Sequence, residues 1–163
     1  MEPIKGSTLI KEGNPNIYLY PQSTLTKEQE SKAISILLVG ETGSGKTTLL
    51  NSLINSIMEV KFDDPYRYII IKEETGKGQE ESQTSDVIIY NILPPKHRNL
   101  PPLKIVDTPG FGDTNGPEED EKIFTKIEDA FKNKIDILTA ICFVAKSSGN
   151  RLSSKEDYIY NKI

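Results

Sequence analysis

The sequence has only one cysteine, Cys142, and it lies in an apolar stretch. A single thiol cannot form an internal disulfide, so we expect a reducing compartment, with the cytoplasm as the default. No apolar run approaches the ~18 residues of a membrane span, and the start of the chain lacks the pattern of a signal peptide. A basic stripe is also missing and the net charge is −4, which argues against nucleic acid as a partner.

Histidine is equally scarce. The only one, His97, falls between two Pro-Pro pairs and is expected to be an exposed loop residue.

The 163 residues suit one domain with a real core. Residues 1–32 contain few periodic apolar positions and predict an N-terminal arm or linker, either mobile or packed through Ile17–Tyr20. The domain itself is expected over residues 33–163.

What the chain does contain is GETGSGKT at residues 40–47, which fits the phosphate-binding pattern G-x-x-x-x-G-K-[ST]. Such a loop turns its backbone N–H groups inward around phosphates. Lys46 would place its ammonium against the β- and γ-phosphates, and Thr47 would give its hydroxyl to Mg²⁺. The candidate nucleotide-binding residues of this segment are Gly40, Glu41, Thr42, Gly43, Ser44, Gly45, Lys46, Thr47 and Thr48.

The flanks of the loop agree with this interpretation. Residues 34–39 are a short apolar run, typical of a strand buried on both faces. After the loop, apolar residues recur at helical spacing and form one face. They are Leu50, Leu53, Ile54 and Ile57.

A second motif, Asp107-Thr108-Pro109-Gly110, follows another short strand, residues 103–106. Asp107 is the candidate second metal residue beside Thr47, holding Mg²⁺ through a water. Gly110 would offer its backbone N–H to the γ-phosphate, a contact that exists only with a triphosphate. A threonine should also close over the γ-phosphate from the polar loop before residue 87. We favour Thr84, with Thr75 and Ser85 as alternatives.

Further strands are expected at residues 68–71, 87–92 and 137–144, and a helix beginning near Pro117. The alternation of strands and helices predicts an α/β fold, a mostly parallel sheet with helices on both faces.

The segments GETGSGKTTLLNSLIN and DTPGFGDT resemble the septin-like GTPases, especially the avirulence-induced (AIG-type, GIMAP-like) proteins. The resemblance covers residues 34–145. It implies a Ras-like P-loop NTPase domain that binds GTP or GDP with Mg²⁺, and homo-oligomeric assembly through the nucleotide face.

Two departures from that pattern limit the activity that we expect. Phe111 stands where Ras-type enzymes carry the glutamine that orients water, so Lys46 and Gly110 can stabilise phosphate but no catalytic residue is evident. We therefore expect slow hydrolysis, or an inactive nucleotide-binding scaffold. A P-loop ATPase is a further alternative, although Thr108 stands where many such enzymes carry an acid.

The guanine-recognition tetrapeptide [NT]-K-x-D is also missing. The nearest string, residues 154–157, is instead expected to begin a helix, since Ser153 and Glu156 form a capping box. The G domain is therefore expected to be C-terminally incomplete, ending before its base-recognition motif.

Overall fold

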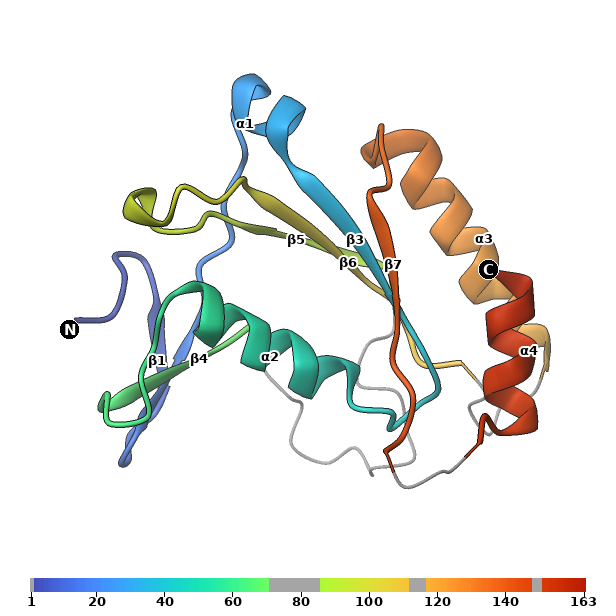
Figure 1. The fold of residues 1–163 in the computed structure, drawn as a ribbon, viewed down its shortest axis with the longest axis horizontal. Helices are drawn as coiled ribbons and strands as arrows, with labels where there is room; N and C mark the ends of the chain where they lie inside the picture. Colours follow the sequence, from blue (N-terminus) through green and yellow to red (C-terminus); the bar gives the residue numbers. More distant parts are fainter. Residues whose placement is uncertain (1, 71–85, 112–116, 148–150) are drawn as a thin grey trace.

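The computed structural model describes residues 2–70, 86–111, 117–147 and 151–163, and these form two β-sheets and their helices (Figure 1). In chain order the elements are β1 (Thr8–Lys11), β2 (Asn16–Leu19), α1 (Lys27–Lys32), β3 (Ile34–Val39), α2 (Lys46–Ile57), β4 (Tyr66–Ile69), β5 (Ile88–Ile92), a 3-10 turn η1 (Lys96–Arg98), β6 (Leu103–Asp107), α3 (Pro117–Lys134), β7 (Ala140–Phe143) and α4 (Ser154–Lys162).

The larger sheet has four strands in the order β5-β6-β3-β7. β3 pairs in parallel with β6 and with β7, whereas β5 runs antiparallel to β6. Leu38 of β3 therefore lies opposite Asp107 on one side and Cys142 on the other. Because the carboxyl ends of these three strands meet at one edge, the segments that follow them are brought together there.

Both faces of this sheet are covered, as Figure 1 shows, with α2 on one side and α3 and α4 on the other. The side chains of β3 alternate accordingly: Leu38 packs in the cluster that contains α2, and Leu37 and Val39 pack in the cluster that contains α3 and α4. A strand buried on both faces needs the unbroken apolar run that the sequence has here. The α/β fold with a mostly parallel sheet and helices on both faces is confirmed.

The N-terminal residues build most of a second, three-stranded sheet, ordered β1-β2-β4. β2 pairs in parallel with β4, so Asn16–Leu19 is fixed to the residues that follow α2. Tyr20, only 3% exposed, then enters the core beside Tyr68. Residues 16–20 thus pack on the domain, while the domain boundary at residue 33 stays a prediction.

Two strand predictions need correction. The strand expected at residues 137–144 is shorter in the structure, Ala140–Phe143, and Ile137 before it is 74% exposed. The strand expected at residues 68–71 begins two residues earlier, at Tyr66, because the parallel partner β2 sets its start; Ile71 lies outside the described residues.

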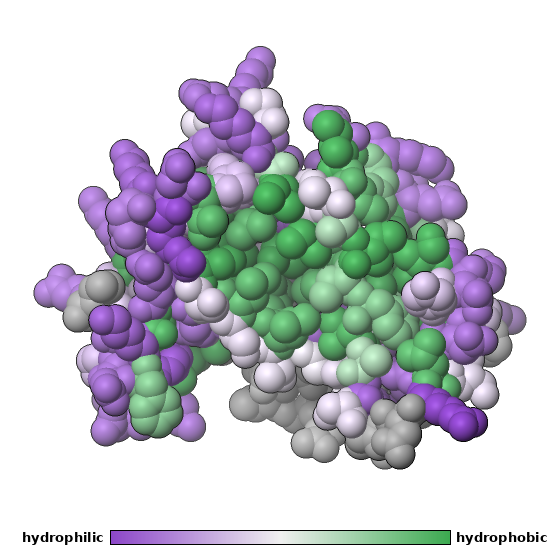
Figure 2. All heavy atoms as spheres, viewed as in Figure 1, coloured by the Kyte–Doolittle hydropathy of each residue, from purple (hydrophilic) through white to green (hydrophobic). Residues whose placement is uncertain are grey.

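Some apolar surface remains uncovered. Figure 2 shows apolar residues gathered across the middle of the face that it presents, over the strands of the larger sheet. β7 is an outer strand of that sheet among the described residues, and its Ile141 is 48% exposed. No helix in the described part of the chain is long and apolar enough to span a bilayer.

Candidate functional site

The phosphate-binding loop connects β3 to α2, and α2 begins at Lys46 as the motif requires. The residue that caps this helix, Gly45, has φ +99°, a left-handed conformation that side chains rarely adopt. A Cβ built at Gly45 meets no atom within 4 Å, so the loop opens onto free space at the N-terminus of the helix. The positive end of the helix dipole makes this position suited to an anion.

Lys46 lies beneath the loop, with only 8% of the residue exposed. Its ammonium donates to the carbonyl of Gly40 at 2.9 Å and to the carbonyl of Glu41 at 3.0 Å. Burial lowers the pKa of Lys46 to about 8, while the carboxylates of Asp107 and Glu41 oppose that shift. Lys46 therefore presents a largely protonated ammonium that the loop itself holds in place.

Two hydroxyls of the loop are poised for a ligand. Thr42 Oγ1 and Ser44 Oγ are buried and have no hydrogen-bond partner among the described residues. A buried polar atom without a partner is costly, so its presence at a loop mouth fits a site completed by an external group. An anion with several oxygens, such as a nucleotide phosphate, would supply partners of this kind.

The second motif lies against the loop through main-chain contacts. The N–H of Thr42 donates to the carbonyl of Phe111 at 3.0 Å, and the N–H of Phe111 donates to the carbonyl of Gly40 at 3.2 Å. A Cβ at Gly110 would lie 2.6 Å from Thr42 Cα and 2.8 Å from its backbone nitrogen. Only glycine permits so close an approach, and the structure thereby brings the two sequence motifs together.

Asp107 ends β6 and is fully buried, and the hydroxyl of the next residue, Thr108, donates to the carbonyl of Leu38 at 2.8 Å. Thr47 is partly buried and Thr48 is exposed. Among the described residues no group of three or more His, Cys, Asp or Glu side chains could hold a metal ion alone. Mg²⁺ held by Asp107 and Thr47 would need phosphate and water oxygens to complete its ligands, which is how this ion binds in nucleotide sites.

Phe111 does not face the site. It is completely buried and packs against Phe124 on α3, with a ring-centroid distance of 4.9 Å. Its position therefore serves the core between the sheet and α3. The structure gives no water-orienting side chain at this point of the chain.

The remaining sequence predictions lie elsewhere. Thr75, Thr84 and Ser85 lie outside the described residues. His97 is an exposed residue, as expected, and its Nε2 lies 2.5 Å from Glu59 Oε2. Ser153 caps α4 and forms the expected capping box with Glu156, so Lys155 and its neighbours are helical.

The sequence did not reveal that Glu41 has side-chain partners near α4. Ser153 Oγ donates to Glu41 Oε1 at 3.0 Å, and Lys146 Nζ lies 3.4 Å from Glu41 Oε2. These partners follow from the strand order, which local sequence patterns do not contain. β7 lies in parallel beside β3, so the residues after β7 had to meet the residues after β3.

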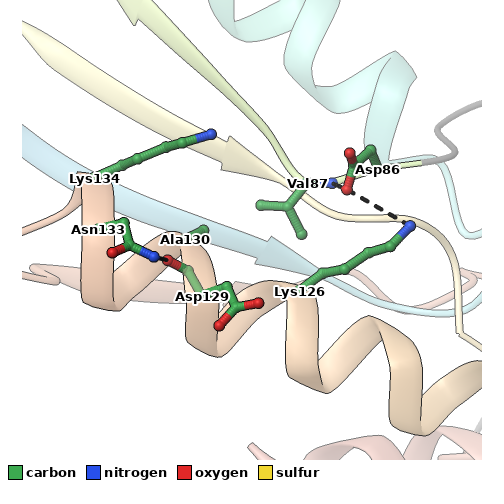
Figure 3. Close-up of a pocket in the computed structure, with 7 residues that line it drawn as sticks. All are labelled: Asp86, Val87, Lys126, Asp129, Ala130, Asn133 and Lys134. Atoms are coloured by element: carbon green, nitrogen blue, oxygen red, sulfur yellow. Dashed lines mark hydrogen bonds and ion pairs between the residues drawn. The ribbon is translucent and has the colours of Figure 1, made fainter.

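A pocket of about 270 Å³ lies between α3 and the residues just before β5 (Figure 3). Lys126 reaches Asp86 across its mouth, with 3.6 Å between Nζ and Oδ1. Its lining contains no residue of either motif, and consists of Asp86, Val87, Lys126, Asp129, Ala130, Asn133 and Lys134. The pocket is therefore separate from the candidate nucleotide site.

With this geometry established, comparison with known proteins decides the family. A family profile described as Septin matches residues 30–144, which is more than half of the chain and includes both motifs. The chain belongs to the septin family. The resemblance drawn from residues 40–55 and 107–114 is thereby confirmed, and with it the assignment to septin-like P-loop GTPase domains.

Three curated relatives agree with the assignment of this septin-family chain. Interferon-inducible GTPase 1 of Mus musculus is 28% identical over 152 residues, covering 84% of this chain and 32% of that protein. Septin-8-A of Danio rerio is 37% identical over 101 residues, covering 61% of this chain and 20% of that protein. Cell division control protein 12 of Saccharomyces cerevisiae (strain ATCC 204508 / S288c) is 32% identical over 85 residues, covering 52% of this chain and 18% of that protein. The septin-family chain thus spans less than a third of the relatives that it matches, and no solved structure matches it.

Proposed function

We propose that this septin-family chain binds guanine nucleotide with Mg²⁺, hydrolyses GTP slowly, and uses the bound nucleotide to control its assembly. The observation that carries the proposal is Lys46, buried beneath the loop and held by two carbonyls beside two buried hydroxyls without partners. The name of one relative, Interferon-inducible GTPase 1, supports guanine over adenine.

In this proposal the loop amides and the Lys46 ammonium bind the β- and γ-phosphates. Gly110, held against Thr42 by main-chain contacts, offers its N–H on the γ-phosphate side, so a triphosphate binds differently from a diphosphate. Asp107 and the hydroxyl of Thr47 would hold Mg²⁺, which would neutralise phosphate charge when bound. The buried hydroxyl of Thr108 fixes the turn after β6 and so the position of Asp107.

Slow hydrolysis follows from Phe111. A ring packed in the core cannot orient the attacking water, and unassisted Ras with its glutamine turns over at only ~10⁻⁴–10⁻³ s⁻¹. We expect single-turnover hydrolysis in that range. A rate above about 1 s⁻¹ for the isolated chain would contradict this part of the proposal.

Base specificity is tested by competition. A fluorescent GDP analogue bound to the protein in the presence of magnesium is titrated with GTP and with ATP. We expect GTP to displace it at concentrations at least about tenfold lower than ATP needs, a difference of ~1.4 kcal/mol. Displacement by ATP alone would favour the P-loop ATPase alternative, which Thr108 in place of an acidic residue already disfavours.

A second candidate is a nucleotide-binding scaffold without hydrolysis, and the buried Phe111 favours it specifically. Phosphate release separates the two. The wild-type chain should release phosphate faster than Lys46→Ala, which loses charge-assisted hydrogen bonds worth about 1.5–3 kcal/mol each and should bind at least tenfold more weakly. Equal release from both, with binding retained in the wild type, would establish the scaffold.

Nucleotide-controlled assembly is the last part of the proposed function. It rests on the resemblance to septins. From that resemblance we infer that a second copy of this chain packs across the nucleotide face. Light scattering of the protein with GDP and with a non-hydrolysable GTP analogue tests it, because a switch requires a different mass in the two states. As part of the same proposal, the protein acts in the cytoplasm, in keeping with its single thiol, Cys142.

A further inference from the structure

Glu41 is the one acidic residue of the phosphate-binding loop, and its carboxylate points away from the phosphate side towards α4. The residue is 9% exposed. Oε1 accepts a hydrogen bond from Ser153 Oγ at 3.0 Å, and Oε2 lies 3.4 Å from Lys146 Nζ. A nearly buried carboxylate with a donor at each oxygen is fixed more firmly than an exposed ion pair would be.

Both donors are themselves held by Glu156, which is 5% exposed. Glu156 Oε2 accepts from the N–H of Ser153 at 2.7 Å, and Oε1 accepts from the N–H of Lys146 at 3.2 Å. The Glu156 N–H donates in return to Ser153 Oγ at 3.0 Å. Ser153 Oγ thus accepts from α4 and donates to the loop, which makes it the link between the two.

The connection continues from Glu41 to the phosphate side. The backbone carbonyl of Glu41 accepts from the Lys46 ammonium at 3.0 Å. On the other side, α4 is anchored in the core by Ile159, which is 1% exposed. A displacement of the N-terminus of α4 would therefore be passed to Lys46 through Ser153 and Glu41.

We propose that Glu41, Lys146, Ser153 and Glu156 form a latch through which α4 sets the position of the phosphate-binding loop and hence the rate of nucleotide release. Glu41 and Ser153 are positioning residues, because they act on the phosphate through Lys46. The inference rests on the proposed nucleotide function. By linkage, any partner that moves α4 changes nucleotide affinity, and nucleotide changes affinity for that partner by the same factor.

The test is a matched pair of variants at Ser153 in the full chain. Asn and Asp have nearly the same shape and both are strong helix N-caps. Ser153→Asn keeps an N–H donor for Glu41, whereas Ser153→Asp removes the donor and places a carboxylate against Glu41. Two readouts are taken: hydrogen exchange of the peptide covering residues 40–47 without nucleotide, and release of a fluorescent GDP analogue with magnesium present.

With Ser153→Asp we expect faster exchange of the loop peptide and release of the analogue at least about tenfold faster, as for loss of a hydrogen bond to a charged group. Ser153→Asn should stay within about twofold of the wild type on both readouts. The double variant Glu41→Gln with Ser153→Asp restores the hydrogen bond with the donor on the loop side. It should return the loop exchange and the release rate most of the way to their wild-type values.

Exchange of the peptide covering residues 154–162 reports whether α4 stays folded. Local unfolding of α4 in Ser153→Asp but not in Ser153→Asn would overturn the proposal, because the effect would then come from helix capping. Equal loop exchange in Ser153→Asn and Ser153→Asp would overturn it as well. If the wild type bound no purine nucleotide, the proposed function would fall, while loop exchange without nucleotide would still decide whether the latch exists.

Discussion

The side chain of Asn55 on α2 forms hydrogen bonds with both backbone groups of Tyr68 on β4. Asn55 Oδ1 accepts from the N–H of Tyr68 at 2.9 Å, and Asn55 Nδ2 donates to the carbonyl of Tyr68 at 2.7 Å. Asn51, one turn earlier, accepts from the N–H of Ile70 at 2.9 Å. The helix after the phosphate-binding loop is thereby joined to the three-stranded sheet through paired amide hydrogen bonds.

Asn55→Ala should lower the free energy of unfolding by about 2–3 kcal/mol, because two backbone groups of Tyr68 lose their partner where water is excluded. Denaturant unfolding measures the change. Asn55 Nδ2 also donates to the carbonyl of Asn51, four residues earlier, at 2.7 Å. Asn133→Ala is the matched control, since Asn133 Nδ2 donates in the same way to the carbonyl of Asp129, but on the exposed side of α3. It should change stability by less than about 0.5 kcal/mol. Equal losses in the two variants would show that the contact with Tyr68 contributes nothing.

Gly110→Ala tests whether the two motifs depend on their close approach. The added Cβ would lie within 2.8 Å of the Thr42 backbone, so the segment containing Gly110 must move away from the loop. We expect a lower unfolding temperature and a larger loss of affinity for a GTP analogue than for GDP, because in the proposed function the Gly110 N–H contacts only the triphosphate. Gly13→Ala is the control, since its Cβ would meet its nearest atom at 3.4 Å, an ordinary contact. Unchanged GTP-analogue affinity in Gly110→Ala would contradict the role of this amide.

Phe111→Gln restores the residue type that orients water in Ras, yet we expect no gain in hydrolysis. The side chain at residue 111 points into the core beside Phe124 and cannot reach a γ-phosphate without leaving it. The variant should instead lose about 3–5 kcal/mol of stability, as for a large aromatic removed from a packed core. Phosphate release and denaturant unfolding measure the two effects. An accelerated rate in a stably folded variant would show that this segment can turn towards the nucleotide.

These cases show what the sequence could and could not predict. Periodicity and motif spacing place β3, the loop, α2 and β6 correctly, because each depends on residues that are local in the chain. The capping box of Ser153 and Glu156 is local for the same reason. The link between Glu41 and Ser153 spans 112 positions and depends on strand order, which local patterns do not contain. The pairing of β2 with β4 was missed likewise, since it joins segments on either side of the phosphate-binding loop.

The last prediction concerns Glu156, whose pKa lies below its ordinary value of 4.5, mainly because the Ser153 N–H donates to its carboxylate. A carboxyl whose folded pKa lies below its unfolded pKa adds stability above the unfolded value, and that stability is lost as the pH falls through the folded value. The advantage of the wild type over Glu156→Gln, measured by denaturant unfolding, should therefore be full at about pH 6 and shrink towards about pH 3.

Glu128→Gln is the matched control for that titration, because Glu128 makes an exposed ion pair with Lys132 on α3, away from the latch. Its difference from the wild type should be small at every pH. If the two variants showed the same pH dependence, the buried hydrogen bonds of Glu156 would not be the source of the effect. A loss of stability in Glu156→Gln that stayed constant from about pH 6 to about pH 3 would mean that the carboxylate charge does not hold Ser153 and Lys146 in place.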